Sequence, residues 1–318
     1  MSRRDCLLAA LVATIWGFNF IVIDWGMDGV PPLLFAAIRF ALVVLPMVFW
    51  LPRPQLPWRT LAGIGACMSL GQFGFLYVSM GAGLPPGLAA LVLQAQVLFT
   101  VLIAAGVLGE RPTATQAGGV VLGSTGLVVV ALGRGGEVTV TALVLCLLGA
   151  LSWGVGNVLA RASGAPGGLA LTVWSAVVVP VPLLALSLVV DGPGAVADGL
   201  GAFGWQAGLS TAYTVVLASF VGYGIFTTLL GRNPSASVVP WVLLAPVTAM
   251  ASAAVLLGQT PNAAETTGAV VMVAGVLVAL RGGRRRRPRR QPALGRGPRS
   301  HSVASGGTTR SACAGIEP

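Results

Sequence analysis

Two similar pairs of side chains, each a tryptophan followed by an asparagine, lie about half a chain apart. Trp16 precedes Asn19 by three residues and Trp153 precedes Asn157 by four, so each pair shares one face of a helix. An amide both donates and accepts hydrogen bonds, and an indole can cover an apolar or cationic group. The pairs therefore suit a pocket for an amino acid. The glycine after each tryptophan equally allows close helix packing, with the asparagine bonded to a neighbouring helix.

Arg39 lies inside an apolar segment, residues 33–51. A charged side chain at the centre of a membrane helix costs about 2.5 to 3.5 kcal/mol on insertion scales, so a compensating interaction is expected. In one interpretation, the guanidinium faces a central cavity and binds a substrate carboxylate. In the other, it pairs with helix-end carbonyls or with Asp24 or Asp28 and holds the first two helices together.

Further polar side chains occur within apolar segments. Gln72 and Tyr223 are within reach of a central cavity, although each can equally form an interhelical contact. Gln94 and Gln96 are separated by about 200° around a helix, so only one of them can face a cavity. Gln96 shares its face with Thr100 and is the favoured candidate.

Glu110 and Arg111 end the fourth apolar segment, directly before a proline. An acid within the membrane is a functional hypothesis by default, and proton coupling by Glu110 is one interpretation. Its position at the membrane face favours the other, a salt bridge or gate contact with Arg111 or Arg53.

No metal site or cofactor is expected. The single histidine, His301, lies in the C-terminal tail, and the four cysteines lack metal-ligand spacing. An intramembrane enzyme needs a buried nucleophile and base, an aspartate pair or a metal. The apolar segments offer none of these, so the sequence argues against an enzyme.

The composition predicts the elements that position these residues. Only 9% of the 318 residues are charged and 55% are apolar, against roughly 25% charged in a soluble domain. We therefore expect an all-α membrane protein with ten transmembrane helices. Apolar runs near the length of about 20 residues that crosses a bilayer occupy residues 6–24, 33–51, 60–80, 87–108, 114–132, 140–160, 169–190, 205–228, 236–257 and 264–280.

An internal duplication divides these segments into two halves. Residues 109–131 and 258–280 align without a gap, matching Gly109, Pro112, Ala114, Gly119, Val121, Gly126 and Val129 with Gly258, Pro261, Ala263, Gly268, Val270, Gly275 and Val278. Five helices in each half would make residues 1–132 and 140–280 two inverted repeats, a common transporter architecture with the substrate site near the midplane. A GxxxG motif at Gly119 to Gly123 could pack within the bundle or between protomers.

The arginines predict the orientation. Of the eight arginines outside the tail and the membrane, seven fall on one side of the membrane and only Arg134 falls on the other. The side with Arg134 also carries acids such as Glu137. Because cytoplasmic loops carry the excess of Lys and Arg, both termini are expected in the cytoplasm, below an inner membrane. Residues 281–318 hold ten arginines and one glutamate. We interpret them as a disordered tail that anchors the topology, with no nucleic-acid partner expected.

The chain resembles the EamA family of the drug/metabolite transporter superfamily, within it most of all the exporters of O-acetylserine and cysteine. Six strings carry the resemblance in order over residues 1–280: MSRRDCLLAALVATIWGFNFIVIDWGM, PPLLFAAIRFALVVLP, GLAALVLQAQVLFTVLIAAGVLGERP, LSWGVGN, VWSAVVVPVP and VGYGIFTTLLGR. The resemblance implies a ten-helix inner-membrane exporter of cysteine-pathway metabolites and related small amino acids. Alternating access between the halves is the expected mechanism.

Two alternatives remain open at this stage. Other metabolites or drugs could be the cargo of the same architecture, or the bundle could be a receptor or scaffold that transports nothing. The sequence leaves the oligomeric state undecided, and the partners it predicts are the bilayer and a small-molecule substrate.

Overall fold

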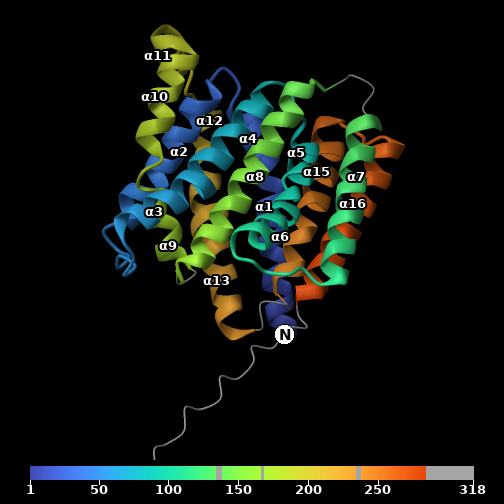
Figure 1. The fold of residues 1–318 in the computed structure, drawn as a ribbon. Coiled ribbons are helices and arrows are strands. Elements are labelled where there is room, and N and C mark those ends of the chain that lie inside the picture. The colour runs from blue at the N-terminus through green and yellow to red at the C-terminus, as the bar shows by residue number, and fades with distance from the viewer. Residues whose placement is uncertain (134–137, 166–167, 234–237, 284–318) are drawn as a thin grey trace, which may run out of the picture. The chain divides into compact units, whose positions relative to one another are not determined.

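The computed structural model describes residues 1–133, 138–165, 168–233 and 238–283, which form helices and no β-strand (Figure 1). The tail from residue 284 onward, Arg134 and Glu137 lie outside these residues. Seven helical segments are long and apolar enough to cross a membrane, which confirms an all-helical, multi-pass membrane protein: α1 (Arg3–Gly26), α3–η1–α4 (Trp58–Gly81), α5–α6 (Pro86–Val107), α7 (Ala114–Gly133), α8 (Val140–Ala162), α12–η2–α13 (Trp205–Arg232) and α16 (Ala263–Gly283).

A bent pair makes an eighth candidate span. Helices α9 (Leu169–Ala176) and α10 (Pro180–Val190) meet at 43°. Pro180 and Pro182 explain the break, since proline lacks an amide donor and is tolerated only in the first turn of a helix. A short helix that the sequence did not predict, α11 (Gly192–Gly201), follows directly.

Two apolar helices are shorter than predicted. Helix α2 (Pro32–Met47) ends four residues before the expected boundary at Leu51, because Pro46 and the following Pro52 disfavour a continued helix. Helix α15 (Leu244–Leu257) is preceded by a 3₁₀ turn, η3 (Val239–Leu243). With these two below membrane length, the count of ten crossings stays a prediction.

Helices α7 and α16 lie side by side (Figure 1) and pack through their glycines. A methyl group on Gly119 would overlap the backbone of Ala279, and one on Gly126 would overlap the backbone of Met272. Small residues that let backbones approach are typical of membrane helix pairs. The GxxxG motif that begins at Gly119 therefore packs within the bundle.

Helices α1 and α8 each pack against the opposite half of the chain. Helix α1 contacts α12 (Trp205–Ala212), η2 (Tyr213–Gly222) and α15, whereas α8 contacts α4 (Gln72–Gly81), η1 (Ala66–Gly71) and α6 (Ala95–Val107). Gly17 of α1 and Gly154 of α8 make these crossings possible. A methyl group on Gly17 would collide with Thr248, and one on Gly154 would lie 2.9 Å from Phe99 Cβ.

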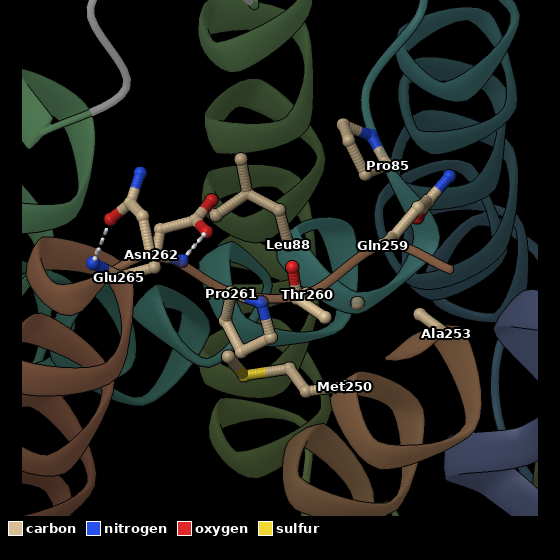
Figure 2. A pocket seen from close by; sticks show the side chains of 10 residues that line it. Pro85, Leu88, Met250, Ala253, Gln259, Thr260, Pro261, Asn262 and Glu265 are labelled. Atoms are coloured by element: carbon tan, nitrogen blue, oxygen red, sulfur yellow. Dashed lines mark hydrogen bonds between the residues drawn. The ribbon is translucent and has the colours of Figure 1, made fainter. Parts of the chain in front are cut away.

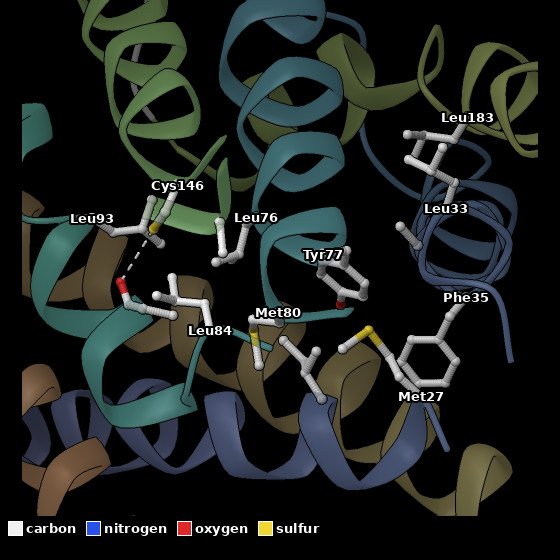
Figure 3. Packing of buried hydrophobic residues seen from close by; sticks show 14 of the residues in the cluster. Met27, Leu33, Phe35, Leu76, Tyr77, Met80, Leu84, Leu93, Cys146 and Leu183 are labelled. Carbon is white, nitrogen blue, oxygen red and sulfur yellow. Dashed lines mark hydrogen bonds between the residues drawn. The ribbon is translucent and has the colours of Figure 1, made fainter. Parts of the chain in front are cut away.

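The largest apolar cluster fills the space between α1, α2, α4, α5 (Pro86–Val92) and α8. Tyr77, Phe35 and Leu76 are fully buried there and lie among Met27, Met80 and Leu84 (Figure 3). This packing fixes the rotation of α2 and α4, the two helices that carry Arg39 and its aromatic neighbours.

Candidate functional site

A cavity of about 90 Å³ brings together three of the predicted site residues, Arg39, Trp153 and Tyr223. Both halves of the chain contribute to it. The first half supplies α2, α3 (Trp58–Gly65), η1 and α4, and the second half supplies α8, α9, η2 and α13 (Tyr223–Arg232). We call it the Arg39 cavity. Its other lining residues are Phe40, Val43, Ile64, Met68, Ser69, Phe73, Leu169, Leu171, Thr172, Val173, Ser175, Ala176 and Ser219.

The Arg39 guanidinium is buried, with 4% of the residue exposed. Its Nη1 donates a hydrogen bond to the Tyr77 hydroxyl at 3.0 Å, and its Cζ lies 4.4 Å from the centre of the Phe73 ring. Nε is buried without a hydrogen-bond partner. Among the described residues Arg39 makes no contact with Asp24, Asp28 or a helix-end carbonyl, and its hydrogen bond to Tyr77 joins α2 to α4 instead.

Two π-helical segments line the cavity, η1 from the third apolar segment and η2 from the eighth. Each segment ends in a glycine that lies close to a neighbouring helix. A methyl group on Gly71 would overlap the side chain of Ser152, and one on Gly222 would lie 2.5 Å from Trp16 Nε1. Gln72 and Tyr223 come directly afterwards. Widened π turns are frequent at functional sites, and here they occur at matching places of the two halves.

Trp16 and Asn19 lie behind η2, outside the cavity lining. The Trp16 indole donates to the carbonyl of Ala218 at 2.9 Å and its ring is 5.1 Å from that of Tyr223. The Asn19 amide oxygen accepts a hydrogen bond from the Thr214 hydroxyl at 2.9 Å. Both side chains therefore contact η2 in this structure and do not line the cavity.

The second pair is divided between the two interpretations. Trp153 lines the cavity, whereas Asn157 donates from Nδ2 to the Thr100 hydroxyl at 3.2 Å and joins α8 to α6. Gln96 and Gln94 are both absent from the described lining, and Gln94 Nε2 points to the carbonyl of Ala90 at 3.4 Å. The predicted choice between the two glutamines thus does not arise at this cavity.

Gln72 is buried beside the cavity and does not line it. Its neighbour Phe73 occupies the cavity face of α4, and the Gln72 amide oxygen is left without a hydrogen-bond partner. Gln72 follows directly on η1, and a widened turn shifts the face that each later residue presents.

Glu110 pairs with Arg161 at 2.9 Å, and not with Arg111 or Arg53 as the sequence suggested. The contact joins the end of the first half's fourth apolar segment to the end of α8. Both side chains are substantially exposed, and exposed ion pairs contribute only about 0 to 1 kcal/mol. We therefore interpret the pair as a surface contact between the halves.

Replacing Glu110 tests the coupling interpretation. We expect Glu110→Gln to leave the response of export to a pH gradient unchanged and to lower the free energy of unfolding by less than about 1 kcal/mol. Arg161→Gln is the matched control because it breaks the same pair without removing an acid. A loss of the pH response in Glu110→Gln alone would restore a coupling role.

A larger cavity of about 310 Å³ lies between the start of α5 and the segment before α16. Figure 2 shows Gln259, Thr260 and Pro261 around it, beside Leu88. It contains none of the residues predicted for the site. Its acid, Glu265, accepts from the backbone amide of Asn262 while the Asn262 side chain accepts from that of Glu265, so this carboxylate caps α16. The smaller Arg39 cavity, which contains three of the predicted site residues, is therefore the candidate functional site.

Comparison with known proteins identifies the fold and its class. The model of the EamA-like transporter family matches residues 4–132 and 140–281, nearly the whole helical region. The chain belongs to the EamA-like transporter family. A solved crystal structure with 20% sequence identity superposes with a TM-score of 0.57, covers 88% of this transporter and 97% of that chain, and supports the fold alone.

Curated relatives of the transporter are named for efflux. A protein of Salmonella typhimurium, "Probable amino-acid metabolite efflux pump", is 40% identical over 91% of this chain and 99% of its own. One with the same description in Escherichia coli K12 is 38% identical over 87% and 95%. A "Probable terminal-alkyne amino-acid exporter" of Streptantibioticus cattleyicolor is 29% identical over 87% and 95%. The family match makes the chain a transporter, and these three relatives are named for the efflux or export of amino acids or their metabolites.

Several lining residues of the transporter were not predicted from sequence. Phe73 is one of them, and together with Tyr77, which the sequence does place within reach of a central cavity, it forms the aromatic surroundings of Arg39 on α4. Their spacing is the one signal that could have indicated them, since residues four apart share a helix face. Ser69 and Ser219 lie in π-helical turns, and the amino-acid composition of a segment does not predict such turns.

Trp16 and Trp153 should differ in their effects on export. We expect Trp153→Ala to raise the KM for export by about tenfold, because it removes a wall of the cavity and its π face. Trp16→Phe removes one hydrogen bond behind η2, which lowers the free energy of unfolding by about 1 kcal/mol and leaves KM within about twofold. Transport kinetics and thermal unfolding of both variants distinguish these roles, and equal changes in KM would contradict the assignment.

Proposed function

We propose that this transporter exports small amino acids and cysteine-pathway metabolites, including O-acetylserine and cysteine, by alternating access. The observation that carries the proposal is the Arg39 cavity, where a buried cation with an unpaired Nε lies between helices of both halves. A guanidinium left with a free donor in apolar surroundings is costly unless something occupies that donor. A substrate carboxylate would supply the missing acceptor.

The geometry of the cavity suits an amino acid in further respects. Arginine presents a planar fork of N–H groups that matches a carboxylate in two parallel hydrogen bonds. Phe73, Trp153 and Tyr223 give aromatic walls for an apolar or sulfur-containing side chain. Hydroxyl groups of Ser69, Thr172, Ser175 and Ser219 supply further polar contacts. In this proposal Arg39, Trp153 and Tyr223 contact the substrate directly.

Two oppositely oriented repeats would give the cavity access to each side in turn. Support comes from the two separate matches to the family model and from α1 and α8, which each cross into the opposite half. In the proposed topology, residues 1–132 and 140–280 together cross the inner membrane ten times, and both termini lie in the cytoplasm. Substrate sites between such repeats are opened by rocking of one bundle against the other.

A second cargo has one observation in its favour. The lining of the Arg39 cavity is mostly apolar and aromatic, and one relative is named as an exporter of terminal-alkyne amino acids. Apolar amino acids with uncharged side chains therefore form the alternative substrate class. Both classes share the carboxylate that Arg39 would bind.

Flux from loaded vesicles tests the proposed function. The full chain is reconstituted into liposomes loaded with radiolabelled cysteine, O-acetylserine or an apolar amino acid, and release is followed with and without a pH gradient. We expect saturable release that exceeds that of protein-free vesicles. Equal release from both kinds of vesicle for every compound would contradict the proposal. Reporter tags at both ends, found on opposite sides of the membrane, would contradict the topology.

A further inference from the structure

Three hydroxyl groups that line the Arg39 cavity have their hydrogens engaged by the backbone. Ser175 donates to the carbonyl of Thr172 at 3.2 Å, and Ser219 donates to the carbonyl of Thr214 at 2.8 Å. Thr172 makes a similar bond to the backbone carbonyl four residues before it. A hydroxyl has one hydrogen and two lone pairs. With the hydrogen engaged, each of these groups can only accept a hydrogen bond from a ligand.

Arg39 has the opposite character. A guanidinium carries five N–H donors and no acceptor, and Nη1 donates to the Tyr77 hydroxyl. Among the described residues that line the cavity, Arg39 is the only one of an ionised type. The cavity therefore has a cationic donor at α2 and neutral acceptors at α9 and η2. A carboxylate matches the donor, and a group rich in N–H matches the acceptors.

An ammonium suits the acceptors better than a neutral group does. Ser175 is 3% exposed and Ser219 is 6% exposed, so bulk water has little access to their oxygens. An ammonium has three N–H donors and no acceptor, and hydrogen bonds from a charged donor are the stronger kind. The rings of Trp153 and Tyr223 add favourable contacts with a cation. A ligand hydroxyl in the same place has one donor and can use one acceptor only.

The two halves of the chain place Arg39 and Ser175 at equivalent positions. Arg39 precedes Pro46 by seven residues, and Ser175 precedes Pro182 by seven residues. These prolines lie in the second helical segment of each half, α2 and the α9–α10 pair. The family model matches the two halves separately. One half thus contributes a donor for a carboxylate, and the other contributes an acceptor at the same position.

We infer that Ser175 and Ser219 bind the α-ammonium of the substrate, so that a free amino group is required for recognition in the Arg39 cavity. The inference rests on the proposed function, because it orients the same amino acid in the same site. The carboxylate lies toward Arg39 and the ammonium toward α9 and η2. Hydroxy acids and amino acids with a blocked nitrogen are excluded. Since recognition depends on the two groups that amino acids share, the side chain can vary within the size of the cavity.

Alanine and lactate test the requirement, because they differ only in the ammonium or hydroxyl at the second carbon. Binding of the radiolabelled compounds to the purified full chain is measured at pH 7.5. We expect a Kd for alanine at least about tenfold below that for lactate, the factor given by 1.4 kcal/mol. N-methylalanine keeps two of the three N–H donors and should bind with a Kd between the two. These measurements use the unaltered protein, so they do not depend on the folding of a variant.

A double variant, Ser175→Ala with Ser219→Ala, tests the two serines. The Kd for alanine should rise at least about tenfold, whereas the Kd for lactate should change by no more than about threefold, because its hydroxyl can use Thr172. Ser210→Ala is the matched control. Ser210 is also buried and donates to a backbone carbonyl, that of Val22 at 2.6 Å, but lies outside the described lining. The control should keep the preference for alanine.

The outcomes separate the inference from the proposed function. Equal or tighter binding of lactate to the unaltered protein would overturn the inference while leaving amino-acid export intact. An unchanged preference for alanine in the double variant, or an equal loss of affinity for both compounds, would also overturn it, since the serines would then have only a structural role. Failure of alanine, lactate, cysteine and O-acetylserine alike to bind would contradict the proposed function and the inference together.

Discussion

Arg39→Gln should lower kcat/KM for export by at least about 100-fold while leaving the protein folded. The loss corresponds to two charge-assisted hydrogen bonds between the guanidinium and the substrate carboxylate, each contributing about 1.5 to 3 kcal/mol. Folding should tolerate the change, because a cation within the membrane is itself unfavourable, and removing it offsets the loss of the hydrogen bond that Arg39 donates to the Tyr77 hydroxyl. We expect the melting temperature to shift by no more than about 4 °C.

Arg53→Gln is the control for removal of a positive charge. Arg53 is exposed in the loop between α2 and α3, with its guanidinium 5.4 Å from the Trp58 ring. It makes no contact with the Arg39 cavity, so export by this variant should match the unaltered protein. Efflux rates, normalised to the amount of reconstituted protein, give the comparison. Equal export by Arg39→Gln and Arg53→Gln would remove the carboxylate-binding role from Arg39.

The apolar segments and the position of Arg39 could be predicted because both depend on local composition. Over the residues that the structure describes, each of the ten predicted segments coincides with one helix or with consecutive helical elements, and the main differences in length occur beside prolines such as Pro46 and Pro180. Arg39 is recognisable because an unpaired charge is expensive in any apolar segment. The match of residues 109–131 with 258–280 likewise indicated α7 and α16, whose glycines pack together.

The direction in which each side chain points could not be predicted in the same way. A regular helix repeats every 3.6 residues, and this rule indicates only that each tryptophan shares a helix face with its asparagine, without showing whether that face meets a cavity or a neighbouring helix. The π-helical turns of η1 and η2 interrupt that period, which leaves Phe73 facing the cavity in place of Gln72. Trp16 faces η2 only because the distant half of the chain packs there. Such contacts depend on tertiary structure and leave no local signal.

The same substitution at two glycines of the α7–α16 pair should have opposite effects on stability. A methyl group on Gly275 would overlap the backbone of Gly123 and lie 2.8 Å from the carbonyl oxygen of Gly119, whereas one on Gly118 has no atom within 4 Å. Backbone atoms cannot move aside as a flexible side chain does. Gly275→Ala should therefore lower the free energy of unfolding by about 2 kcal/mol, within the range for overpacking.

Gly118→Ala should leave stability unchanged or raise it, because alanine favours a helix over glycine by about 1 kcal/mol. Thermal unfolding of the purified variants, together with the yield of monodisperse protein, measures the difference. Gly118 is next to Gly119 on α7, but only Gly119 faces the backbone of α16. The different effects expected at Gly275 and Gly118 therefore depend on which face of α7 meets α16. Similar stability of Gly275→Ala and Gly118→Ala would mean that the two helices are not held at backbone contact. The fifth and tenth apolar segments would then be free to separate, and the two predicted halves would lose the glycine contact that joins them.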